Sequence, residues 1–257
     1  TLRCFYKFLR TGRGLGWALT RKHFIVMLGL FLGIMVVSWI VSLLGGSDMT
    51  SIRYWLFYIV SLVLSVWFSA SMNKIMLNAH AGEEPSFSTF GQMLPKLGGL
   101  IVLNVVVSFI CMLPMLVGVV ILVAGLGSSL AVADFSNPYE LGYTLGMMFS
   151  GVSGIVSILF SLVALYLVLR LMFTVLAYVD DSSLGVFDAI QRSWSMTHGN
   201  MGKIILAVLM MIVLNIIGFI ALIVGVVVTL IISAFMIVTL YEQIKASEQL
   251  AVADEAG

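Results

Sequence analysis

The fold is decided by residues 201–241, which read MGKIILAVLMMIVLNIIGFIALIVGVVVTLIISAFMIVTLY. An apolar helix of about 20 residues crosses the hydrocarbon core of a membrane, where it satisfies its own backbone hydrogen bonds. This stretch is about twice that length, so the chain must turn back once within it. Asn215, Gly218 and Gly225 favour a break, which predicts a turn near residues 218–222.

Four further apolar runs are long enough to cross a membrane, at about 24–44, 54–76, 97–122 and 145–179. The first ends at Gly45 and Gly46, Pro114 predicts a kink in the third, and the fourth crossing should begin near Val152. The hydrophobic share of 61%, the charged share of 10% and a mean hydropathy of +1.14 agree with this pattern. The sequence therefore predicts an all-α integral membrane protein with six transmembrane helices.

Positive charges lie on one side of these runs. They precede the first span, flank the loops after the second and fourth spans, and follow the sixth, at Arg3, Lys7, Arg10, Arg13, Arg21, Lys22, Lys74, Lys96, Arg192, Lys203 and Lys245. The opposite side has Arg53 beside Asp48, and the segment 125–143 has Asp134 and Glu140 without any Lys or Arg. The positive-inside rule then predicts a multi-pass membrane protein with both termini in the cytoplasm. The N-terminal segment lacks the pattern of a secretory signal, so we expect none.

An internal repeat divides the chain. Four residues, Phe87, Phe90, Leu94 and Leu97, recur one hundred positions later as Phe187, Ile190, Trp194 and Thr197, each set before a long apolar run. Residues 17–24 and 194–201 are also alike. We therefore expect a single membrane domain over 1–257, made of three units in which a cytoplasmic amphipathic elbow helix precedes a hairpin. The expected parts are a basic interfacial helix (1–20), three hairpins (21–80, 81–180 and 181–245) and a cytoplasmic tail (246–257).

We call the elbow helices expected before the second and third hairpins, near residues 87–97 and 187–197, the first elbow and the second elbow. The second elbow carries the clearest prediction of a helical face. Phe187, Ile190 and Trp194 should point into the bundle or the acyl boundary, while Asp188, Gln191 and Arg192 should face the cytoplasm. In the N-terminal segment, Arg and Lys can meet anionic lipid while the aromatic residues dip into the acyl boundary.

Residues 179–200 read VDDSSLGVFDAIQRSWSMTHGN and are followed by the double span that ends at Tyr241. This pattern resembles the bacterial multi-pass family that includes the membrane domain of some glycerophosphodiester phosphodiesterases, most clearly from Arg170 to the C-terminus. The resemblance implies a helical membrane fold in the bacterial inner (plasma) membrane, and many relatives are stand-alone proteins of unknown function. No segment outside the spans is long enough to fold as the soluble hydrolase domain, so we expect no hydrolysis from these residues.

Few residues in the sequence suggest a catalytic or metal-binding site. His23, His80 and His198 are expected to be solvated interfacial side chains, although a zinc site remains the alternative if they converge. The carboxylate pairs Glu83–Glu84 and Asp180–Asp181 are expected to be solvated charges that precede the elbow helices. Cys4 and Cys111 predict no disulfide. We therefore expect no catalytic, cofactor or metal site, and no enzyme.

Six residues are candidates for contact with lipid or a partner protein: Arg170, Trp194, Arg192, Trp17, Arg21 and Lys22. Arg170 is expected near the cytoplasmic end of the fourth span, where it pairs with Glu242 or the Asp180–Asp181 loop, or binds an anion such as a lipid phosphate. Asn104 and Asn215 should hydrogen-bond neighbouring helices, and Gly29 with Gly33 permits close helix packing or a dimer face.

Two classes of function fit these features. The first is a non-catalytic membrane protein that scaffolds or anchors a membrane assembly or organises lipid, with membrane lipids and other membrane proteins or a second copy as partners and no nucleic acid. The second is a small carrier or channel for a lipid or amphipathic solute. A cavity lined by Asn104, Ser108, Ser157 and Arg170 would favour the carrier, and a solidly packed bundle with an exposed apolar flank would favour the assembly role.

Overall fold

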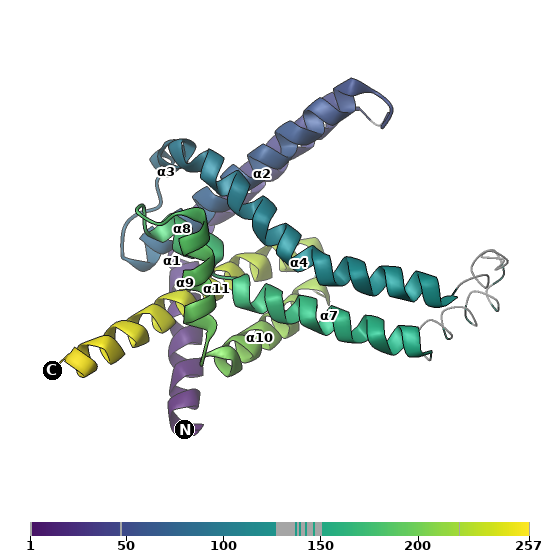
Figure 1. Ribbon diagram of the computed structural model, residues 1–257. Helices are drawn as coiled ribbons and strands as arrows, with labels where there is room; N and C mark the ends of the chain where they lie inside the picture. The colour runs from purple at the N-terminus through teal and green to yellow at the C-terminus, as the bar shows by residue number, and fades with distance from the viewer. Residues whose placement is uncertain are drawn as a thin grey trace. The chain divides into compact units, whose positions relative to one another are not determined.

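The structure is a computed structural model that describes residues 2–46, 48–126, 151–220 and 222–256, together with Asn137, Tyr139, Gly142 and Gly146. These residues form helices without strands (Figure 1). In chain order they are α1 (Leu2–Gly45), α2 (Ile52–His80), α3 (Ser88–Met93), the 3-10 helix η1 (Leu94–Lys96), α4 (Leu97–Leu126), α7 (Val152–Leu171), α8 (Thr174–Asp180), α9 (Val186–Thr197), α10 (Met201–Ile220) and α11 (Leu222–Ala256).

Six segments of the described chain are long and apolar enough to cross a membrane: Lys22–Gly45, Ile52–His80, Ser88–Ala124, Val152–Asp180, Met201–Ile220 and Gly225–Leu250. This confirms the prediction of a multi-pass helical membrane protein. One predicted boundary is confirmed as well, because α7 begins at Val152. The predicted turn near residues 218–222 includes Ala221, which lies outside the described residues, and the two helices on either side of it, α10 and α11, pack against each other.

The chain divides into two compact units. One consists of residues 1–104 and 173–257, and the other of residues 105–172. In the first unit, α11 packs against α1, α2, α9 and α10, while α2 packs against α3 and α8. Its fully buried side chains include Met27, Ile75, Phe173, Phe235 and Ile244.

The core of the first unit lies toward one end of the hairpin formed by α1 and α2. Buried residues of α2 begin at Ala70 and continue to Ala79, whereas the part of α2 before them exposes apolar side chains such as Trp55 and Leu62. At the other end, Gly46 has φ +77°, a left-handed conformation that glycine adopts without strain. The exposed apolar flank suits contact with lipid rather than water.

The second unit contains α7 and the part of α4 from Val105 onward. The Ser157 hydroxyl on α7 donates a hydrogen bond of 2.6 Å to the carbonyl oxygen of Gly118 on α4. A Cβ at Gly118 would lie 3.1 Å from Cβ of Phe160, so glycine permits this close approach. Helix α4 continues past Pro114.

Two expectations for the first span differ from the structure. The predicted interfacial helix over 1–20 is the start of α1, which runs to Gly45 as one helix. The Gly29 and Gly33 pair is exposed, and a Cβ at either residue would meet nothing within 4 Å. Their predicted role in packing within the chain is therefore wrong, because α1 packs through Met27 and Leu30; the dimer face stays a prediction.

Candidate functional site

Helix α9 has three distinct faces. Its buried face consists of Ala189, Ser193, Met196 and Thr197, and this face packs on α8 and α11. A second face is apolar and turned outward, with Phe187 74% exposed and Trp194 40% exposed. The remaining polar positions are Asp188, Gln191, Arg192 and Ser195. A helix with separate apolar and polar outer faces can lie in a membrane interface.

The first elbow repeats this pattern of burial. Phe87, one hundred positions before Phe187, is also 74% exposed, and Leu94, the counterpart of Trp194, is 52% exposed. Thr89 and Met93 are buried, as are Ala189 and Ser193 at the matching positions. Both elbows thus turn large apolar side chains outward and pack through other residues.

This arrangement separates the two predicted surroundings of the apolar face of α9. Phe187 is turned away from the bundle and Trp194 is partly exposed, so the acyl boundary remains the prediction for these side chains. The small side chains of Ala189 and Ser193 let α9 approach α8 and α11 closely, which bulky rings at those positions would prevent. Truncation of the exposed Trp194 should therefore cost less than the roughly 3 to 5 kcal/mol typical of a buried tryptophan.

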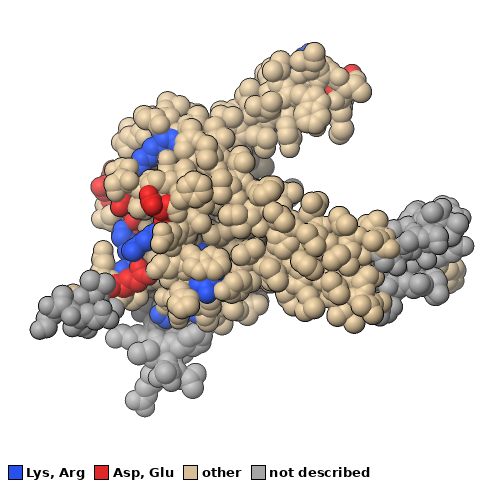
Figure 2. Space-filling model, viewed as in Figure 1, with Lys and Arg blue, Asp and Glu red and all other residues tan. Residues whose placement is uncertain are grey.

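Polar contacts join α8 and α9 to α11. Lys245 Nζ on α11 lies 2.5 Å from Oδ2 of Asp180 at the end of α8, and the Tyr241 hydroxyl donates to the same oxygen at 2.9 Å. Arg192 of α9 pairs with Glu248 of α11 at 3.1 Å. Figure 2 shows blue and red side chains gathered where α8, α9 and the C-terminal part of α11 meet.

The indole of Trp67 contacts the first elbow. Nε1 of Trp67 on α2 donates a hydrogen bond of 3.0 Å to the carbonyl oxygen of Phe90 on α3, and the two rings meet edge to face. Sequence reasoning missed Trp67 because nothing in the apolar run of α2 distinguishes this tryptophan from its lipid-facing neighbours.

The two carboxylates after the fourth span have different surroundings. Asp180 is half-buried in the ion pair with Lys245, so the expectation that it is a solvated charge is wrong. Asp181 is exposed and accepts hydrogen bonds from the N–H and the hydroxyl of Ser183, at 2.9 and 2.7 Å. These bonds, the backbone one first, lower the pKa of Asp181 below its ordinary value.

Arg170 lies in the last turn of α7 and is buried. Its Nε donates a hydrogen bond of 2.8 Å to the hydroxyl of Tyr166, one turn earlier, and its guanidinium carbon is 5.2 Å from the centre of that ring. The local tyrosine was missed from the sequence, although its spacing of four residues on one helix could have revealed it. Pairing of Arg170 with Glu242 or Asp180, or with an anion, stays a prediction.

The other candidate residues for lipid contact, and the histidines, lie on different helices. Lys22 is exposed on α1, whereas the side chains of Trp17 and Arg21 lie outside the described residues. His23 is buried, which corrects its expected solvation, while His198 is exposed at the end of α9. Among the described residues, no three His, Cys, Asp or Glu side chains come together at a spacing that could hold a metal ion.

Arg170, α9 and the ion pairs of α11 all fall in one region of the chain. Residues 142–253 match the family model for the membrane domain of glycerophosphoryl diester phosphodiesterase. The match confirms the resemblance predicted from Arg170 onward, and it extends through α10 and most of α11. Comparisons with curated proteins and with solved structures found no match.

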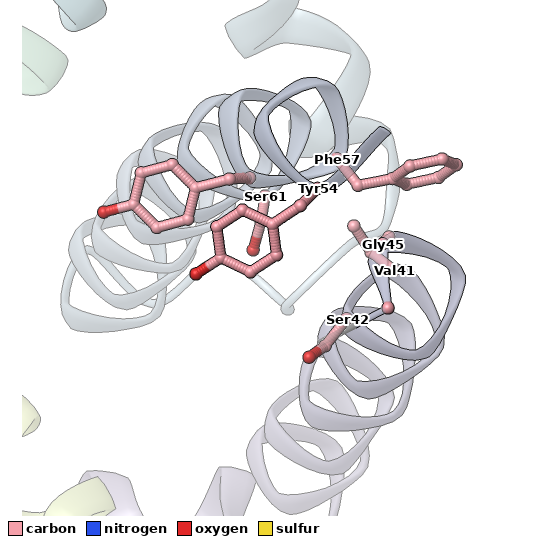
Figure 3. A pocket seen from close by; sticks show the side chains of 8 residues that line it. Val41, Ser42, Gly45, Tyr54, Phe57 and Ser61 are labelled. Carbon is pink, nitrogen blue, oxygen red and sulfur yellow. The ribbon is translucent and has the colours of Figure 1, made fainter. Parts of the chain in front are cut away.

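A small cavity lies outside the part that matches this phosphodiesterase membrane domain. It has a volume of about 110 Å³ and is lined from α1 by Val41, Ser42, Gly45 and Gly46 and from α2 by Tyr54, Phe57, Tyr58 and Ser61 (Figure 3). Its lining includes none of the residues expected for a carrier cavity. Of those residues, Ser157 is bonded to Gly118 and Asn104 bonds to the Leu100 carbonyl within its own helix. The prediction that Asn104 bonds a neighbouring helix is therefore wrong.

Proposed function

We propose that this chain is a non-catalytic membrane protein that anchors or scaffolds a membrane assembly or organises lipid, and that its two elbow helices insert into one leaflet. The matched outward apolar faces of α3 and α9 carry this proposal. Phe87 and Phe187 are equally exposed, and Leu94 and Trp194 are exposed beside them. In water these side chains would form a costly apolar surface, whereas the acyl boundary accommodates them.

The order of the spans supports insertion into the same leaflet. Helix α3 follows the second apolar segment and α9 follows the fourth, and successive spans run in opposite directions. Both elbows then lie on the side that carries most of the positive charge, which is the cytoplasmic side by the positive-inside rule. The matched family supports a role in the membrane, because its model describes the membrane domain of the phosphodiesterase.

A hydrogen bond in the second unit and the small size of a cavity in the first favour this role over that of a carrier. The Ser157 hydroxyl binds a backbone carbonyl, so it does not offer its proton to a solute. The cavity between α1 and α2 holds no more than a few water molecules at its volume of about 110 Å³. A lipid or an amphipathic solute needs a much larger site.

Cysteine labelling tests the insertion of the elbows. In a chain with Cys4→Ala and Cys111→Ala, a polarity-sensitive fluorophore is attached at Phe87→Cys, Phe187→Cys or the matched control Asp188→Cys, and the protein is placed in lipid vesicles. Spin-labelled lipids should quench positions 87 and 187 strongly and position 188 weakly, and aqueous iodide should show the reverse order. Equal iodide quenching at all three positions would overturn the proposal.

Two activity measurements test whether the protein is neither a lipid carrier nor a hydrolase. Vesicles that contain the protein should translocate fluorescent lipid no faster than empty vesicles, and the protein should release no alcohol from glycerophosphodiesters above a heat-denatured control. Faster translocation would support the carrier instead, and hydrolysis would contradict a non-catalytic role.

A further inference from the structure

Two lysines come together at the first elbow. Lys74 lies near the end of α2 and Lys96 at the end of η1, and both side chains are half-buried. The positive charge of Lys74 acts on the Lys96 ammonium group. Among the described residues, no carboxylate lies within ion-pair distance of either ammonium group. Two like charges that are partly removed from water repel each other, and a bound anion would lower this repulsion.

A tyrosine from α8 completes this cluster. The Lys96 ammonium lies 5.8 Å from the centre of the Tyr178 ring. The ring reaches the first turn of α4, because a Cβ at Gly99 would overlap the Tyr178 hydroxyl and lie 2.9 Å from its Cζ. Glycine at position 99 therefore leaves room for this hydroxyl at the start of α4, on the ring that Lys96 faces.

Asp181 does not neutralise the cluster. Its charge acts on Lys96, but it is exposed, and its Oδ1 already accepts both hydrogen bonds from Ser183. One exposed carboxylate against two half-buried ammonium groups leaves a net positive charge. Lysine binds phosphate as a point charge, and the tyrosine hydroxyl adds a donor.

We propose that Lys74, Lys96 and the Tyr178 hydroxyl bind the phosphate of an anionic phospholipid. The choice of a lipid over a free phosphate rests on the apolar surface next to the lysines. Leu94 lies two residues before Lys96 on η1, and the exposed Phe87 belongs to the same elbow. Acyl chains can cover these side chains while the headgroup meets the ammonium groups, as in other basic pockets between membrane helices. This inference deepens the lipid-organising part of the proposed function.

Native mass spectrometry of the intact chain, released from mixed vesicles of phosphatidylglycerol and phosphatidylcholine, tests the site. The wild type should retain phosphatidylglycerol in preference to phosphatidylcholine. Lys74→Gln and Lys96→Gln should each lower its retention about fivefold. Tyr178→Phe should lower retention by a smaller factor, about threefold.

Matched variants separate a site from general surface charge and from misfolding. Lys203→Gln removes the same charge near the second elbow and should leave retention unchanged, while Lys96→Arg should keep most of it. Equal losses from Lys203→Gln and Lys96→Gln, or no loss from the double variant Lys74→Gln with Lys96→Gln, would overturn the proposal. So would displacement of the lipid by millimolar inorganic phosphate, which would identify a site for the free anion.

The two proposals fail separately. Loss of the lipid preference while the labels at positions 87 and 187 remain inserted would overturn the phosphate site alone. Failure of those labels to insert, with the lipid preference retained, would overturn the leaflet insertion alone.

Discussion

The carboxylate of Asp180 and the ammonium group of Lys245 form an ion pair across 65 positions of sequence, with Tyr241 as a second donor to the same oxygen. The pair connects the end of the fourth span to the last helix. It lies next to the ring contact between Phe173 and Tyr241, so an apolar layer borders it on one side.

Asp180→Asn should destabilise the detergent-solubilised protein by about 1 to 3 kcal/mol, because Lys245 and Tyr241 lose a charged acceptor in a half-buried place. Glu248→Gln is the control, since the Arg192–Glu248 pair is more exposed and should contribute about 1 kcal/mol or less. Thermal unfolding of both variants checks this. Equal effects would mean that burial does not distinguish the two pairs.

Asn215→Ala should lower stability by about 0.5 to 1.5 kcal/mol. The Asn215 side chain donates to the Ser233 hydroxyl on α11 at 3.1 Å, and such bonds between membrane helices contribute modestly. Asn104→Ala removes a bond to the same helix and should change stability less. A larger loss from Asn104→Ala, measured by unfolding in denaturant, would contradict this assignment.

Gly218→Ala should destabilise the hairpin of α10 and α11 by about 1 to 3 kcal/mol, because the new Cβ would lie 2.7 Å from Cγ2 of Thr229 and 2.9 Å from the Gly225 carbonyl oxygen. Gly29→Ala adds its methyl group into open space and should be neutral or stabilising. Unfolding measurements compare the two. If Gly29→Ala instead abolished a dimer in analytical ultracentrifugation, Gly29 would belong to the predicted dimer face.

Ser183→Ala should raise the pKa of Asp181 part of the way toward its ordinary value of 3.8, since the hydroxyl bond is lost and the backbone bond remains. A carboxylate with a lowered pKa contributes stability above its ordinary pKa and loses that contribution as the pH falls through the lowered value. Carbon-13 NMR of labelled aspartate, assigned with Asp181→Asn, measures the shift. Ser182→Ala should leave the pKa unchanged, and a downward shift in Ser183→Ala would contradict the hydrogen-bond origin.

Membrane-impermeant labelling in spheroplasts should modify Asp48→Cys from outside and leave Glu84→Cys and Asp188→Cys protected until the membrane is opened. The positive-inside rule gives this expectation. External labelling of position 188 would contradict a cytoplasmic α9.

The spans could be predicted from the sequence because lipid exposure leaves little room for polar residues, and the pairing of α10 with α11 followed from the length of the apolar run. The buried face of α9 could not. Inside or beside a bilayer, hydrophobicity does not separate contact with lipid from contact with protein, and small residues such as Ala189 and Ser193 mark the packed face instead. The Asp180–Lys245 pair was missed for another reason, because residues 65 positions apart leave no periodic signal.

The length of α11 has a mechanical consequence. Its 35 residues extend over about 50 Å, more than the roughly 30 Å of a hydrocarbon core. The part that carries Lys245 and Glu248 is tied by ion pairs to the end of α8 and to α9. With α9 in the membrane interface, as proposed, a tilt of α11 within the bilayer would displace α9 as well, because the ion pairs connect the two helices. A change in bilayer thickness would then move the second elbow.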